Sequence, residues 1–138
     1  MNSDDLSNII IHTYRDAYAN SFKFLNLQWI EEFFVVEEED LKILSNPKSY
    51  VLDQGGEIFF ALQAGKVIGT SAMVLVKPRV FELAKMSVDR AFQGKGVGRL
   101  LIEASIEFAR KKAATEIFLI TNNKLIPALN LYKSSGFN

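Results

Sequence analysis

Cysteine is absent from the 138 residues of this chain, which excludes disulfide bonds, thiolate metal sites and a cysteine acyl-enzyme. Net charge is absent too, because 16 lysines and arginines balance 16 aspartates and glutamates. This balance argues against a nucleic-acid or membrane-surface partner held by a broad basic field. The single histidine, His12, has no second ligand at a metal-site spacing, so no metal is expected.

Long apolar runs are missing as well. No stretch reaches the roughly 20 residues that a membrane-spanning helix needs, and residues 1–7 lack the basic start and apolar run of a secretory signal. A cytoplasmic protein with no membrane partner is therefore expected. Hydrophobic residues make up 49% of the chain and charged residues 23%, as in an ordinary globular protein. Because no linker or repeat is visible, a single domain over residues 1–138 is predicted.

Hydrophobic periodicity predicts a mixed α/β layer. Phe22, Leu25 and Trp29 recur at the spacing of one helical face. The Ala-Gly pair at 64–65 suits a hairpin connection, so its flanking strands are expected to be antiparallel neighbours. The predicted strands cover 8–14, 57–63, 66–76, 80–88 and 115–121, and the predicted helices cover 18–36, 38–44, 94–112 and about 125–134.

Glycine is concentrated in the segment Gln93-Gly94-Lys95-Gly96-Val97-Gly98-Arg99, between a predicted strand and an amphipathic helix. Glycines let backbone amides point inward, and a helix N-terminus adds unpaired donors and a positive dipole. The segment is therefore predicted to hold a phosphate group, with Lys95 and Arg99 adding positive charge. The alternative is a glycine-rich turn that binds nothing.

Two familiar phosphate motifs do not fit this spacing. A P-loop needs a glycine and four residues before Gly-Lys-Ser/Thr, but Asp89 stands where that glycine belongs and Gly96 where the hydroxyl belongs. A dinucleotide fingerprint that starts at Gly94 needs glycine or alanine where Arg99 stands. Both motifs are therefore excluded.

The pattern of Gln93, Gly96 and Gly98 resembles the Gln/Arg-x-x-Gly-x-Gly/Ala signature of the GNAT superfamily of acyl-CoA-dependent N-acetyltransferases. Residues 81–88 resemble the fourth strand of that family. The segment from Asn123 to Phe137 resembles its closing Asn…Ala-x-x-Leu-Tyr-x-x-x-Gly-Phe motif. The resemblance spans nearly the whole chain and implies an α/β GNAT-like fold: a central, mostly antiparallel sheet with helices on both faces.

The resemblance also implies acetyl-CoA as cosubstrate. In the family the fourth strand splays open and pairs its backbone with pantetheine, which here points to Met86 and Val88. Asn123 would face the pantetheine or the acceptor. The residues whose backbone amides would hold the pyrophosphate are Gln93, Gly94, Lys95, Gly96, Val97, Gly98 and Arg99.

Two catalytic residues follow from the resemblance. Tyr132 stands where the family often places a general acid for the departing thiolate; the alternative is a core aromatic residue. Glu82 stands on the fourth strand, where the family often has an acidic residue. It is the candidate base, direct or through water, because an ammonium must lose a proton before it can attack. The alternative for Glu82 is a surface ion pair.

The acceptor half of the site is less defined. The acidic run at 37–40 either attracts a cationic amine or is a solvated helix end, and the second interpretation is favoured. In the family, the first two helices line the acceptor pocket, which suggests Trp29, Phe33 and Phe34, although periodicity favours the core for Trp29 and Phe33. The family's sheet continues with one or two strands after its Gly-Phe pair, which this sequence lacks.

The predicted function is transfer of an acetyl group from acetyl-CoA to a primary amine by direct attack in a ternary complex. The amine stays open among polyamines, amino-acid derivatives, antibiotics and protein amines. The main alternative is a non-catalytic CoA-binding or regulatory module, and a weaker one is a nucleotide-binding protein that prefers ATP. Homodimers are common in this family, so monomer and dimer both stay open.

Overall fold

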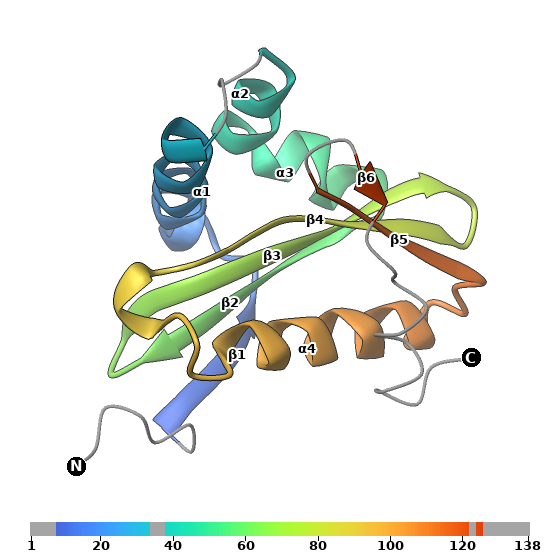
Figure 1. The fold of residues 1–138 in the computed structure, drawn as a ribbon. Coiled ribbons are helices and arrows are strands. Elements are labelled where there is room, and N and C mark those ends of the chain that lie inside the picture. The colour runs from blue at the N-terminus through green and yellow to red at the C-terminus, as the bar shows by residue number, and fades with distance from the viewer. Residues whose placement is uncertain (1–7, 34–37, 122–123, 126–138) are drawn as a thin grey trace.

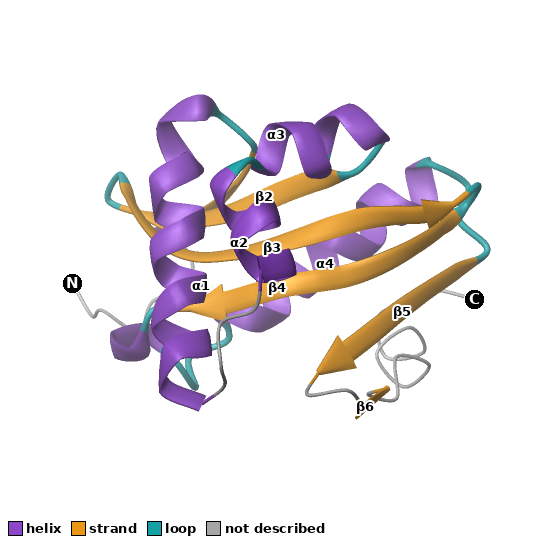
Figure 2. Ribbon diagram, turned by 90° about the horizontal axis from the view of Figure 1, so that it is seen from above, coloured by secondary structure: helices purple, strands orange, loops and turns teal. Residues whose placement is uncertain are grey.

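The described part of the chain forms a six-stranded sheet whose strands lie side by side in chain order (Figures 1 and 2). The computed structural model describes residues 8–33, 38–121 and 124–125. Neighbouring strands are antiparallel except β4 and β5, which are parallel. The strands are β1 (Ile9–Thr13), β2 (Glu57–Gln63), β3 (Lys66–Lys77), β4 (Val80–Val88), β5 (Glu116–Thr121) and β6 (Lys124–Leu125).

Helices cover both faces of this sheet, as Figure 1 shows. One face carries α1 (Ala19–Phe33), α2 (Glu38–Ser45) and α3 (Pro47–Tyr50), and the other carries α4 (Val97–Lys111). The connections include three 3-10 turns: η2 (Asp16–Tyr18), η3 (Leu52–Gln54) and η4 (Arg90–Phe92). The predicted fold class is confirmed. Among the described residues, no helix combines the length and apolarity needed to cross a membrane.

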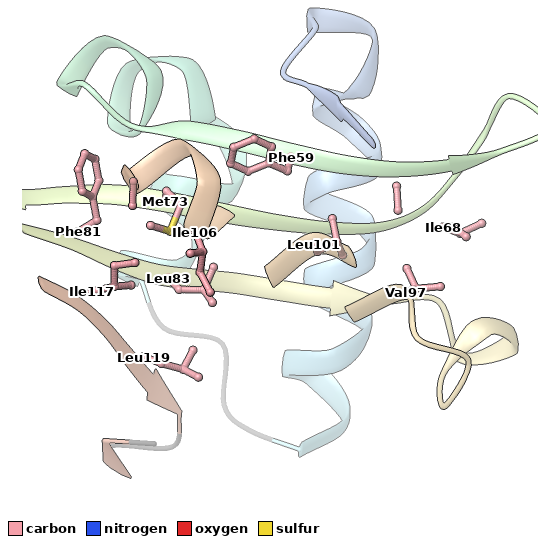
Figure 3. Close-up of a cluster of buried hydrophobic side chains, with 12 residues drawn as sticks. Phe59, Ile68, Met73, Phe81, Leu83, Val97, Leu101, Ile106, Ile117 and Leu119 are labelled. Atoms are coloured by element: carbon pink, nitrogen blue, oxygen red, sulfur yellow. The ribbon is translucent and has the colours of Figure 1, made fainter. Parts of the chain in front are cut away.

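Strand alternation divides the apolar side chains between two cores. Along β2, Phe59 and Ala61 point toward α4, whereas Ile58 and Phe60 point toward the opposite helices. Figure 3 shows the core beneath α4, which also contains Met73, Phe81, Leu83, Leu101, Ile106, Ile117 and Leu119. The sheet is therefore buried on both faces, as the nearly continuous apolar sequence of its central strands requires.

Gly69 on β3 sets how closely α4 approaches the sheet. A Cβ atom at this position would lie 3.1 Å from both Leu101 Cδ1 and Val97 Cγ1, tighter than ordinary van der Waals contact. Val97 and Leu101 are themselves fully buried. The missing side chain therefore lets the first turns of α4 rest directly on β3, which fixes the position of that helix's N-terminus.

Most predicted elements agree with the structure, and β2 and β4 have the predicted bounds. One short helix was not predicted: α3 begins at Pro47, because proline is well suited to the first turn of a helix, where its missing N–H is not needed. The helix predicted over about 125–134 is wrong at its first residue, since Leu125 pairs with Ile120 in the ladder between β5 and β6. Its other residues lie outside the described part of the chain.

Candidate functional site

Strands β4 and β5 begin as a pair and then separate. Their register runs from Val80 opposite Glu116 to Leu83 opposite Leu119, and within the described residues it goes no further. The rest of β4 continues to Val88 and pairs only with β3. Figure 2 shows the two parallel strands diverging toward their C-terminal ends. One edge of residues 84–88 is therefore left with backbone groups that an extended ligand can pair with, as an added strand does.

Within the described part of the chain, residues 84–88 pair with β3 but not with β5, and this part of β4 is here called its unpaired stretch. A β-bulge lies within it. Ala84 is opposite Ala72 and Ser87 is opposite Thr70, so β4 contains one more residue than β3 between these two pairs. Lys85 takes up the difference in a left-handed conformation with φ of 51°. Bulges of this kind bend a strand and redirect its backbone groups. Met86, one of the two predicted pantetheine residues, directly follows the bulge.

The turn after β4 is held in place by its own side chains. Asp89 accepts a hydrogen bond from the backbone N–H of Ala91 at 2.9 Å and donates its own N–H to the carbonyl of Ile68 at 2.8 Å. The Nε2 atom of Gln93 donates to the carbonyl of Val88 at 3.2 Å. The side chain of Gln93 therefore ties the glycine-rich segment back to the end of β4.

Two glycines then turn the chain into α4. Gly94 has φ of 76° and Gly96, the N-cap residue, has φ of 87°, a region that residues with side chains rarely adopt. The first backbone hydrogen bond of α4 joins the N–H of Leu100 to the carbonyl of Gly96 at 3.2 Å. The amides before Leu100 have no acceptor within the helix, and together with the helix dipole they favour an anion.

Gly98 differs from Gly94 and Gly96, because neither its backbone angles nor its packing requires a glycine. It lies in the first turn of α4, its φ is not in the left-handed region, and a Cβ atom built on it would meet nothing within 4 Å. Glycine inside a helix costs about 0.5–1 kcal/mol relative to alanine. The space beside Gly98 is therefore available to a ligand that approaches the helix end closely, which fits a pyrophosphate group.

The two predicted cations differ in their surroundings. Lys95 is half-buried, whereas Arg99 is exposed and its Nε lies 3.1 Å from Glu103 Oε1 one turn along α4. An exposed pair of this kind contributes little to stability. Arg99 can therefore leave Glu103 for a phosphate at small cost.

Glu82 lies on the face of the sheet that carries α1. It is opposite Val74 on β3 and beside Phe118 on β5, at a partly buried position. Val74 packs in the core on the α1 side, so Glu82 points to that side as well. No ion pair of Glu82 is found within the described residues. The carboxylate therefore lies near the point where β4 and β5 part, two residues before Ala84.

Several predicted site residues are not placed by the structure. Asn123, Tyr132 and Phe34 lie outside the described residues. Trp29 and Phe33 lie on α1, as predicted. From the acidic run at 37–40, Glu38 begins α2, and its carboxylate is 4.0 Å from Lys42 Nζ one turn later.

One link between α1 and β4 was not predicted from the sequence. Ser87 is buried, and its hydroxyl donates to the carbonyl of Leu25 at 2.9 Å. The contact fixes α1 over the unpaired stretch of β4. A signal was present in the sequence, because Ser87 is a small polar residue whose neighbours in the strand, Met86 and Val88, are apolar.

Comparisons with known proteins agree on one family. The sequence profile of the acetyltransferase (GNAT) family matches residues 12–137. The N-acetyltransferase YvbK of Bacillus subtilis, itself uncharacterised, is 31% identical over 101 residues, covering 71% of this chain and 65% of that protein. N-acetyltransferase 8 of Rattus norvegicus is 30% identical over 95 residues, covering 65% of this chain. The chain spans about a third to two thirds of the length of the curated relatives it matches.

Solved structures share the fold. A GNAT-family acetyltransferase from Staphylococcus aureus superposes with a TM-score of 0.77 at 22% identity, covering 91% of this chain and 81% of that one. Rv2747 from Mycobacterium tuberculosis, solved in complex with CoA, superposes with a TM-score of 0.65 at 18% identity, covering 94% of this chain and 71% of that one.

Proposed function

The chain belongs to the acetyltransferase (GNAT) family, and on that premise we propose that it transfers an acetyl group from acetyl-CoA to a primary amine by direct attack in a ternary complex. One observation carries the proposal. The unpaired edge of β4 leads directly, through a turn held by Asp89 and Gln93, to the free amides and the open space at the N-terminus of α4. A ligand with an extended arm that ends in a pyrophosphate can pair with the edge of β4 along the arm and bind the helix amides at its end.

The residues proposed to hold acetyl-CoA fall into two groups, those that bind the pantetheine arm and those that bind the pyrophosphate. Backbone groups of Met86 and Val88 pair with the amide groups of the pantetheine arm, and the amides from Gln93 to Arg99 hold the pyrophosphate. Asn123 faces the pantetheine or the acceptor. Acetyl-CoA supplies a thioester whose carbonyl carbon an amine can attack. The chain contributes proximity and orientation, which account for much of the rate when two substrates react directly.

Glu82 is the proposed base. The amine must be deprotonated before it attacks, and the backbone of Glu82 lies about 7 Å along the strand from that of Ala84, where the unpaired stretch begins. The proposed proton transfer runs through one water molecule. The absence of an ion pair to Glu82 among the described residues leaves its oxygens available for that water.

Tyr132 is the proposed acid that protonates the departing thiolate. We expect Tyr132→Phe to lower kcat by at least about tenfold, less than the usual hundredfold or more of a general acid, because a thiol is acidic enough for water to supply its proton in part. Steady-state kinetics with the amine at saturation measure the effect. Binding of acetyl-CoA to the variant serves as the control, and a kcat equal to that of the wild type would contradict the role.

The acceptor is proposed only as a class. One relative, an N-acetylaspartate synthetase from Xenopus tropicalis, is 36% identical over 96 residues, and solved neighbours include a glucosamine-6-phosphate N-acetyltransferase and an aminoglycoside acetyltransferase bound to sisomicin. These names suggest L-aspartate, glucosamine 6-phosphate and sisomicin for a first panel, and spermidine and a lysine-containing peptide add the polyamine and protein classes. A cytoplasmic location and a homodimer stay predictions.

Calorimetric titration with acetyl-CoA, with CoA and ATP as comparators, is the first test. Micromolar binding of acetyl-CoA with no response to ATP is expected, followed by release of free thiol with at least one amine of the panel. Binding without thiol release for any amine would favour the non-catalytic CoA-binding module. Preference for ATP would favour a nucleotide-binding protein.

A further inference from the structure

Two buried hydroxyl groups join α4 to the sheet. Ser71 of β3 and Ser105 of α4 are both fully buried, and their Oγ atoms lie 3.1 Å apart. The hydroxyl of Ser105 also donates to the carbonyl oxygen of Leu101 at 2.8 Å. A serine hydroxyl has a single proton, so the proton between the two hydroxyls comes from Ser71. The hydrogen bonds therefore run in one direction, from Ser71 to Ser105 and from Ser105 to the carbonyl of Leu101.

Thermodynamic stability does not explain this pair. Within the described residues neither hydroxyl has another partner, and the carbonyl of Leu101 is already the helical acceptor for the backbone N–H of Ser105. Ser71 shares its face of β3 with the core residue Met73. Replacing a buried hydrogen-bonded pair by apolar groups of the same shape can be nearly neutral or even stabilising. Two alanines would therefore fill these positions with little or no loss of stability.

A hydrogen bond fixes the position of α4 in a way that apolar contacts do not. Apolar contacts are non-directional, whereas a hydrogen bond weakens steeply when its distance or angle changes. Gly69 sets how closely α4 approaches β3, through its contact with Val97 and Leu101. Ser71 lies two residues further along β3, and Ser105 lies one turn after Leu101 on α4. Their hydrogen bond therefore sets where α4 lies along the strand.

The same segment of β3 supports the other half of the proposed cosubstrate site. Thr70 is opposite Ser87, near the end of the unpaired stretch of β4. The carbonyl of Ile68 accepts the N–H of Asp89, where the turn after β4 begins. Residues 68–71 of β3 therefore contact both parts of the site, the strand edge and the helix that would bind the pyrophosphate. A shift of α4 along β3 would change the distance between these two parts.

We propose that Ser71 and Ser105 are positioning residues for acetyl-CoA. Their hydrogen bond fixes α4 along β3, so that the amides at the helix N-terminus meet the pyrophosphate while the pantetheine arm is paired with the edge of β4. The inference deepens the proposed binding of acetyl-CoA and rests on it. Both serines are fully buried, so they act through the placement of α4 and touch neither substrate.

The main test is the double variant Ser71→Ala/Ser105→Ala. It removes both hydroxyls and leaves no buried donor without a partner, so its melting temperature should lie within about 3 °C of the wild-type value. The calorimetric Kd for acetyl-CoA should rise about tenfold, the effect of losing one charge-assisted hydrogen bond to the pyrophosphate. With the amine of the panel that the wild type acetylates fastest, kcat at saturating acetyl-CoA should stay within about twofold, because only cosubstrate binding is weakened.

The two single variants separate positioning from stability. Ser105→Ala leaves the hydroxyl of Ser71 buried without a partner and should lower the melting temperature by several degrees. Ser71→Ala leaves Ser105 bonded to the carbonyl of Leu101 and should melt close to the wild type. Both break the link to β3, so both should raise the Kd for acetyl-CoA about as much as the double variant does. A Kd that rises in Ser105→Ala and not in Ser71→Ala follows stability alone and overturns the proposal.

Thr70→Val is the matched control. Thr70 is also fully buried and is next to Ser71 on β3, but its hydroxyl donates to the carbonyl of Phe59 at 2.9 Å and has no bond to α4. This variant should lose stability and keep the Kd for acetyl-CoA within about twofold. A loss of affinity equal to that of the serine variants would show that any buried hydroxyl of β3 has this effect, which overturns the specific role of the link to α4.

The remaining outcomes distinguish this inference from the proposed function. An unchanged Kd in the folded double variant overturns the positioning role and leaves acetyl transfer intact. If the double variant does not fold, Ser71→Ala decides the case, because it leaves every remaining hydroxyl bonded. Calorimetry needs no amine, so the Kd values test the role of the serines whether or not an acceptor is found. A wild-type chain that does not bind acetyl-CoA overturns the proposed function, together with the role of both serines.

Discussion

Replacing Gly98 by leucine is expected to weaken acetyl-CoA binding about a hundredfold, which corresponds to about 2.7 kcal/mol. The side chain would occupy the space beside the first turn of α4, where an added Cβ atom would meet nothing within 4 Å. That space is where the proposed pyrophosphate contact with the helix amides lies. Calorimetric titration with acetyl-CoA measures the loss directly.

The thermal stability of Gly98→Leu should not fall with its affinity for acetyl-CoA. Gly98 has helical backbone geometry, and leucine is a far better helix former than glycine, so the melting temperature should be equal to or above that of the wild type. Glu107→Leu is the matched control, because it places leucine on an exposed position near the other end of α4. A stable Gly98→Leu chain that binds acetyl-CoA as tightly as the wild type would show that the glycine-rich segment is only a turn.

Replacing Glu82 by glutamine is expected to lower kcat/KM near neutral pH by about a hundredfold or more, the usual contribution of a general base. Glutamine keeps the size and partial burial of the side chain but cannot accept the amine's proton. The position on β4 should therefore remain packed between Val74 and Phe118. Acetyl-CoA affinity should not change, since the proposed contacts with the cosubstrate lie further along the strand.

The pH profile separates a base from a structural residue. The lysine amine has a pKa near 10.4 and a peptide α-amine one near 8 in water, so the fraction of free amine rises with pH and the need for a base falls. The deficit of Glu82→Gln should therefore be greatest near neutral pH and shrink as the pH approaches the pKa of the amine. A deficit equal at every pH would indicate a structural role. Glu107→Gln, an exposed carboxylate paired with Arg110 on α4, should follow the wild-type profile.

Local sequence determined most elements of this protein. Alternating apolar residues and the Ala-Gly pair at 64–65 specify the hairpin of β2 and β3, because side-chain period and turn chemistry act over a few residues. The glycines at 94 and 96 likewise specify the entry into α4, since only glycine adopts their backbone angles easily. These features of the candidate site were predictable for that reason.

The tertiary structure decided the features that depend on elements far apart in the chain. The point where β4 and β5 part is set by how two strands separated by α4 pack together. The hydrogen bond from Ser87 to the carbonyl of Leu25 exists only because α1 lies over β4. Sequence pattern identifies which residues prefer a strand or a helix. It does not determine where pairing ends or which partner a buried polar side chain finds, because those follow from contacts between surfaces that only folding brings together.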